Sequence, residues 1–268
     1  VETARLADEE VVVVTLLDEV RNANVALVTD KLSILDRLRA AVEAQKRFVA
    51  DAAHELRTPL AAMQIEVDNL GSGGGPEHAA QIAALAASVK RASVLANQLL
   101  ELARLDDPIL GRSQSVDLSA LLLDCVAACA PMADRKGVDL GADVIPAMEM
   151  FGVECELRAL LTNLIDNAVR YTPRGGMVDV FLGRRDDQVI AEIVDTGPGL
   201  PPGAETRIFD RFYRGAPSKA DGTGLGLAIA RRVAERHGLS LSVENRRDGV
   251  SGACARIVAP KTAVGVAS

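Results

Sequence analysis

Two long stretches of helical periodicity, separated by a glycine-rich break, constrain the fold of the N-terminal part of this chain more than any other feature. From Val25 to about Leu70, apolar residues recur at spacings of three, four or seven. Gly71-Ser-Gly-Gly-Gly-Pro76 interrupts this pattern, and Pro76 is well placed to open a new helix. A second Ala/Leu-rich helical pattern extends from residue 77 to residue 106. The pattern predicts a helical hairpin.

Such a hairpin carries an apolar seam that two helices cannot cover by themselves. Two copies of the hairpin can bury the seam in a four-helix bundle, so we expect a homodimer. The alternative is a monomeric hairpin that docks its seam on the rest of the chain.

After a linker at residues 107–115, the pattern changes to that of a mixed α/β domain at residues 116–260. Helices are predicted at 118–136, 155–171 and 225–237, and strands at 138–144, 177–182, 189–194, 239–245 and 253–258. The Gly- and Pro-rich residues 197–223 predict a mobile loop, and residues 261–268 a flexible tail.

Composition excludes some classes of function. The net charge of −7 argues against a general nucleic-acid binder. The spacing of the four cysteines fits no zinc pattern, so we expect buried, reduced thiols at Cys125, Cys129, Cys155 and Cys254. The purely apolar run at residues 11–14 is far shorter than the ~20 residues that a membrane helix needs.

The segment from Phe48 to Leu60 carries the first string that suggests chemistry. His54 and Glu55 stand side by side, as a nucleophilic imidazole and a carboxylate that can accept its proton. Thr58 lies four residues after His54, so on a helix it shares the same face and can orient a water molecule. Pro59 has no N–H, which predicts a kink beside the histidine.

Asn163 and Asn167 form a second candidate site, because they lie one turn apart on a predicted helix. Their side-chain oxygens are the hard ligands that Mg²⁺ and a bound triphosphate would require. Arg170 and Tyr171 follow on the same helix and can meet a phosphate or a base. The simpler alternative is a polar seam on the helix surface.

Two glycine-containing loops complete the set of candidate sites. Asp195-Thr-Gly-Pro-Gly199 follows a predicted strand, where the Asp195 carboxylate can accept a hydrogen bond from an exocyclic amine such as that of adenine. Gly197 and Gly199 permit a close approach of the backbone. The second loop opens a helix, whose N–H groups favour phosphate; it consists of Gly222, Thr223, Gly224, Leu225 and Gly226.

Between these loops, Ile208-Phe-Asp-Arg-Phe-Tyr-Arg214 places three aromatic residues and two arginines in a loop. Exposed aromatics in a mobile loop suggest docking onto another surface. The alternative is a small local core beneath the loop.

Together these strings resemble the kinase core of a sensor histidine kinase of a two-component system. His54-Glu-Leu-Arg-Thr-Pro-Leu60 is similar to the H-box of that family, and the strings that resemble its N, G1, F and G2 boxes are 163–171, 195–199, 208–214 and 222–226. All five strings occur in the family's order and spacing, over about residues 45–260. Unrelated chains would not reproduce five strings in order.

The resemblance implies the fold class α+β. A dimerisation and histidine-phosphotransfer hairpin at 45–106, which forms a four-helix bundle in the dimer, would precede an α/β sandwich of the GHKL ATPase type. It further implies that ATP phosphorylates His54, with Glu55 as the base, and that the phosphoryl group passes to an aspartate of a response regulator. Thr58 would assist dephosphorylation of that partner.

By the same resemblance, Asn163 and Asn167 would handle Mg²⁺–ATP and Asp195 would bind the adenine. Mg²⁺, the helix start near Gly226 and Arg211 or Arg214 would neutralise the phosphate charge. Members of the family are usually membrane-bound, so we expect this cytoplasmic portion to belong to a parent protein of the bacterial inner membrane. The membrane contact would come from a segment absent from this chain.

Residues 1–44 match the family less well. They are interpreted as a degenerate or truncated HAMP-like signalling linker, or as a coiled-coil extension. Two other functions are compatible with parts of the sequence. A non-catalytic scaffold would bind nucleotide without turnover, and a GHKL-type ATPase would hydrolyse ATP without any use for the His54 string.

Overall fold

The computed structural model describes residues 31, 34, 51–53, 55–65, 67, 76–105, 113–185, 188–215 and 222–260. The chain divides into two compact units, residues 1–57 and 58–268. All described residues of the first unit are helical, and so are residues 58–65 and 67 of the second. Pro59 therefore lies within helical residues, as predicted. The segments predicted as a HAMP-like linker (apart from residues 31 and 34), as the Gly71–Gly75 break and as the tail lie outside the described residues.

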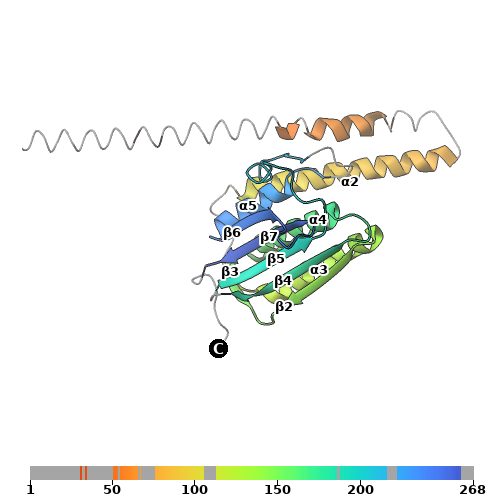
Figure 1. Ribbon diagram of the computed structural model, residues 1–268. Coiled ribbons are helices and arrows are strands. Elements are labelled where there is room, and N and C mark those ends of the chain that lie inside the picture. The colour runs from red at the N-terminus through yellow and green to blue at the C-terminus, as the bar shows by residue number, and fades with distance from the viewer. Residues whose placement is uncertain are drawn as a thin grey trace, which may run out of the picture. The chain divides into compact units, whose positions relative to one another are not determined.

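A five-stranded sheet forms the centre of the C-terminal domain. Its strands follow the order β2 (Asp139–Val144), β4 (Met177–Arg185), β5 (Gln188–Asp195), β7 (Ala253–Ala259) and β6 (Ser240–Asn245). β2 runs parallel to β4, and the other neighbouring strands are antiparallel. Three helices lie on one face of this sheet (Figure 1): α3 (Leu118–Lys136), α4 (Glu154–Tyr171) and α5 (Gly226–Arg236).

The core of the domain lies between the sheet and these helices. Alternate residues of β4 are buried, as the period of two in a strand requires: Val178, Val180 and Leu182. The central strand β5 is buried continuously over residues 189–193. From the helices, Leu122, Leu161, Ile165 and Ile229 are at most 2% exposed. Burial of each such side chain stabilises the fold by about 1.5–3 kcal/mol. The domain thus has the aliphatic core expected of a chain without Trp.

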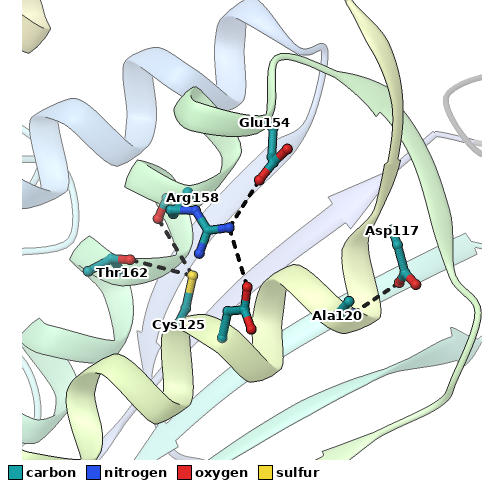
Figure 2. A network of polar contacts seen from close by, with 7 residues as sticks. Asp117, Ala120, Cys125, Glu154, Arg158 and Thr162 are labelled. Atoms are coloured by element: carbon teal, nitrogen blue, oxygen red, sulfur yellow. Dashed lines mark hydrogen bonds and ion pairs between the residues drawn. The ribbon is translucent and has the colours of Figure 1, made fainter.

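The ends of α3 show why the sequence specified this helix so well. Asp117 at its N-cap accepts a hydrogen bond from the Ala120 N–H at 2.9 Å, and Gly137 at its C-cap adopts a left-handed conformation with φ 69°. Figure 2 shows the Asp117 cap and the seam between α3 and α4. Arg158 of α4 pairs there with Asp124 of α3 at 3.4 Å and with Glu154 at 3.0 Å. The cap thus marks the start of α3, and the Arg158 pairs lie along its exposed seam with α4.

Helix α2 (Pro76–Leu105) is the second helix of the predicted hairpin, and it begins at the expected proline. One side of α2 is buried at Leu95, Leu102 and Leu105. The Leu105 carbonyl accepts a hydrogen bond from Arg236 of α5 at 3.3 Å. Other large apolar residues of α2 remain exposed: Ile82, Val89, Val94 and Leu100.

The structure adds two short strands that the sequence did not predict, β1 (Gln114–Asp117) and β3 (Glu149–Gly152). They pair antiparallel in a separate two-stranded sheet, and β1 begins inside the segment predicted as a linker. Four-residue strands are too short to show a period, and here each depends on a partner more than 30 residues away.

The predicted burial of all four cysteines was partly wrong. All four are free thiols, but only Cys125 and Cys129 are buried, whereas Cys155 is exposed and Cys254 is half-buried. Cys155 lies in the first turn of α4, at a position that does not face the core. Burial raises the pKa of the Cys129 thiol to about 11, which disfavours the reactive thiolate.

Candidate active site

Helix α4 carries the asparagine pair on its polar side. Its leucines, isoleucine and valine are all buried, which leaves Asn163 and Asn167 half-buried beside them. The Asn163 amide Nδ2 donates to the Ala159 carbonyl at 2.8 Å, and its Oδ1 faces the start of α5. A Cβ atom added at Gly226 would lie 2.8 Å from this Oδ1. The asparagine string thus lies directly against the start of α5.

The end of α4 brings the next candidate residues to the same place. Arg170 pairs with Asp166 at 2.7 Å, and its Cδ would lie 3.7 Å from a Cβ at Gly222. Tyr171 is half-buried, and its backbone carbonyl approaches Gly197 of the loop after β5. One helix therefore contacts both glycine-containing loops.

Lys136 supports the end of α4 through contacts that the sequence did not predict. Its Nζ donates to the carbonyls of Val169, at 2.9 Å, and of Arg170, so it satisfies acceptors in the last turn of α4. Burial lowers the pKa of Lys136, and the nearby Arg170 adds to this effect. A lysine in the last turn of α3 gives no sequence signal for a role at another helix.

Asp195 ends strand β5 and is buried, with an exposed fraction of 8%. Its Oδ1 accepts hydrogen bonds from the N–H groups of Gly197, at 2.8 Å, and Ala253, at 3.2 Å. Both of these bonds fall on Oδ1, so Oδ2 is left as an acceptor toward a ligand.

Burial raises the pKa of the Asp195 carboxyl above its ordinary value. The two backbone N–H groups and the nearby Arg246 act in the opposite direction, because each favours the charged form. The carboxylate is thus a partly desolvated acceptor whose orientation is fixed from one side. Buried carboxyl groups with shifted pKa values are typical of functional sites.

The loop of residues 222–226 leads into α5. Leu225 stands at the N-cap, is fully buried and supplies no side-chain cap. The first N–H groups of α5 are therefore available to an anion, which the helix dipole also favours. Thr223 Oγ1 accepts from the Leu225 N–H at 3.3 Å and donates to Gln98 of α2 at 2.6 Å.

The aromatic string between the two loops forms a small local core, which was the alternative reading of this segment. Ile208 is buried with Ala204 and Val243, and Phe209 and Tyr213 pack against this cluster. The Phe212 N–H donates to the Gly224 carbonyl at 2.9 Å, which ties the string to the second glycine-containing loop. Arg214 is exposed.

The structure therefore assembles four of the five strings around α4 and α5. The fifth is the His54 string. His54 itself lies outside the described residues, whereas Glu55 and Thr58 are helical and exposed.

Comparison with known protein families separates the His54 string from the other four strings in the same way. Residues 44–108 match the family model of the His Kinase A (phospho-acceptor) domain. Residues 152–263 match the model of the histidine kinase-, DNA gyrase B- and HSP90-like ATPases.

Individual relatives are sensor kinases. The sensor protein kinase PmrB of Pseudomonas aeruginosa is 37% identical over 87% of this chain and 49% of its own length. The sensor protein QseC of Salmonella typhi is 37% identical over 81% of this chain and 48% of its own length. The structure of full-length ShkA in complex with AMPPNP is similar with a TM-score of 0.61 and 29% identity, over 83% of this chain and 47% of that one.

The fold and the four assembled strings define a nucleotide-binding domain of the histidine kinase, gyrase and HSP90 type. Together with the phospho-acceptor domain, they show that the chain belongs to the sensor histidine kinases of two-component systems. It spans about half the length of the curated relatives given above. Within the described residues, no helix has the length and apolar character that crossing a membrane requires.

Proposed function

We propose that this chain is the kinase core of a sensor that phosphorylates its own His54 from ATP and passes the phosphoryl group to a response regulator. The observation that carries the proposal is the geometry of Asp195. Its Oδ1 is held by two backbone N–H groups and its Oδ2 is left for a ligand, in a domain of the ATPase family. A single fixed acceptor suits the exocyclic amine of adenine.

The remaining residues of the site would hold the rest of the nucleotide. The N–H groups at the start of α5, with Gly222, Thr223 and Gly224 before it, suit the phosphates. Arg170, Tyr171 and Arg214 lie on the segments that border the site and would contact the base or the phosphates.

Magnesium would be held by Asn163 and Asn167. The amide oxygens of these side chains and the phosphate oxygens of ATP would be the ligands. The Asn163 Oδ1, which faces the start of α5, fits this hard-oxygen set. Bound Mg²⁺ would neutralise phosphate charge.

In the reaction, a ring nitrogen of His54 attacks the γ-phosphorus of ATP. A bond forms between nitrogen and phosphorus, the bond from the γ-phosphorus to the bridging oxygen breaks, and ADP leaves. Glu55 holds the other ring N–H and takes up its proton. The exposure of Glu55 and Thr58 supports access to this segment. In transfer, an aspartate oxygen of the receiver attacks the same phosphorus and the histidine leaves.

We further propose that the chain is a homodimer. The exposed apolar residues Leu60, Ile65, Ile82 and Val89 provide surface for a four-helix bundle. Thr58 would position the water that removes phosphate from the receiver. We also propose that the parent protein lies in the bacterial inner membrane, with this portion on the cytoplasmic side; relatives named as sensor proteins, of about twice this length, support this.

Labelling with ATP that carries a radioactive γ-phosphate tests the proposal. Wild type should acquire an acid-labile, alkali-stable label, and His54→Gln should acquire none while it still binds ADP. His78→Gln is the matched control, because it removes another histidine of the helical hairpin and should keep the label. Label that persists in His54→Gln, or steady hydrolysis of ATP without any label, would contradict the proposal.

A further inference from the structure

The turn between β6 and β7 holds the loop that follows β5. We define the G1 loop as residues 195–200 and the brace as residues 245–253. The Leu200 N–H donates to Asn245 Oδ1 at 2.6 Å, and Asn245 Nδ2 donates to the Leu200 carbonyl at 3.1 Å. Ser251 Oγ donates to the Gly197 carbonyl at 2.8 Å. The brace therefore holds the G1 loop at its middle and at its end.

The beginning of the G1 loop is held from the same side. The Ala253 N–H donates to Asp195 Oδ1 at 3.2 Å, and Arg246 donates to the Asp195 carbonyl at 3.3 Å. Gly252 has φ 147°, and a Cβ added there would overlap the Asp195 carbonyl oxygen. The two segments are thus packed backbone against backbone, which only glycine permits at this position.

We propose that Asn245 and Ser251 are positioning residues for nucleotide binding, acting through the G1 loop. This inference rests on the proposed function of Asp195 as the adenine acceptor. Neither residue needs to touch the nucleotide. Asn245 supplies hydrogen-bond partners for the backbone N–H and carbonyl of Leu200, and Ser251 supplies a donor for the Gly197 carbonyl. Held in this way, the loop backbone reaches the adenine in one conformation and loses less conformational entropy on binding.

The exposure of Asn245 distinguishes a role in positioning the G1 loop from a role in stabilising the fold. Asn245 is exposed at the end of β6, and both hydrogen bonds that it makes to Leu200 are exposed. Exposed hydrogen bonds contribute little to global stability, because water can replace them. Their loss should therefore loosen the G1 loop without unfolding the domain.

Calorimetry of ADP binding to the whole chain tests the inference with Asn245→Ala and Ser251→Ala. Asn245→Ala should weaken ADP binding about tenfold, since two hydrogen bonds are lost, and Ser251→Ala about threefold, since one is lost. Arg247→Ala is the matched control: its side chain is 86% exposed and pairs with Glu244, three residues earlier in the chain. This control should bind ADP within about twofold of wild type.

Two further measurements exclude a merely structural effect. Asn245→Ala should raise the KM for ATP in self-phosphorylation while the rate at saturating ATP stays near that of wild type. Chain that is already phosphorylated should transfer its phosphoryl group to a receiver at the wild-type rate, because that step uses no nucleotide. Asn245→Asp, which keeps the acceptor for the Leu200 N–H, should show an intermediate loss of ADP affinity.

The outcomes separate this inference from the proposed function. If wild type binds ADP and Asn245→Ala binds it equally well, the brace has no positioning role and the proposed function stands. If wild type binds neither ADP nor ATP, both are wrong. Should Asn245→Ala fail to fold, Ser251→Ala decides: wild-type affinity in that variant would overturn the inference.

Discussion

Helices α2 and α4 are both long and leucine-rich, yet they use their apolar residues differently. Every Leu, Ile and Val of α4 is buried within the domain, whereas α2 leaves Ile82, Val89, Val94 and Leu100 exposed. The apolar side of α4 is therefore fully covered by residues of the same chain. The exposed apolar residues of α2 support the proposed dimer instead, in which a second copy would cover them. The nucleotide domain is thus packed within one chain, whereas we propose that the hairpin is completed by a partner.

The largest expected effect tests the contrast between α4 and α2 in the core of the nucleotide domain. Ile165→Ala, at a fully buried position of α4, should lower the free energy of unfolding of the nucleotide domain by about 3 kcal/mol, through lost burial and a cavity. Ile82→Ala, at a position 51% exposed on α2, should leave that free energy unchanged and weaken self-association instead. Chemical denaturation and analytical ultracentrifugation measure the two effects. Equal destabilisation of the domain by both variants would contradict the distinction.

The next effect concerns the nucleotide domain alone. Asp195→Asn should weaken ATP binding about 100-fold, because the amide keeps an acceptor for Gly197 and Ala253 but presents a donor to the adenine amine. The fold should be retained, since burial already disfavours the charge at this position. Asp143→Asn, at an exposed position of β2, is the control and should bind ATP normally. Calorimetry and thermal unfolding report both quantities.

The same carboxyl predicts a dependence on pH. The charged Asp195 is the stronger acceptor for the adenine amine, and burial raises its pKa, so affinity should fall as the pH is lowered toward that raised value. The onset should come at a higher pH than for an ordinary carboxyl group. The ATP affinity of Asp195→Asn should not fall over the same pH range. A parallel fall in both proteins would show that another group causes the pH dependence.

The smallest effect lies in the hairpin. Thr58→Ala should slow the removal of phosphate from a receiver about tenfold, because a positioned water is lost, while self-phosphorylation stays within about twofold of wild type. Thr58 is exposed, so the change should not alter stability. Time courses with phosphorylated receiver measure the first rate and ATP labelling the second. Equal loss of both activities would argue against a water-positioning role.

Local sequence signals predicted the elements whose ends are marked by nearby residues. Helix α3 was predicted at its observed bounds, because Asp117 caps its start and Gly137 ends it. The strands β5, β6 and β7 were predicted to within one residue at each end, whereas β4 extends three residues beyond its predicted end, to Arg185. β1 and β3 were missed because a four-residue strand has no readable period and each requires a distant partner.

At the site, the motif residues were visible because loops that approach a ligand need glycine and short polar residues. Their supports were not visible. Lys136 and Asn245 act on backbone groups of segments about 33 and 45 residues away in the chain, and no local pattern records such a contact.

The sequence by itself determined the longer helices and strands of the nucleotide domain, the family and the strings that carry its chemistry, because periodicity, caps and glycine loops are local properties of the chain. Only the tertiary structure decided which oxygen of Asp195 is held and which is left for a ligand. It also decided that the aromatic string packs beneath its own loop, and that the β6–β7 turn braces the G1 loop. Those outcomes depend on contacts between residues far apart in the chain, whose geometry is set only when the sheet has formed.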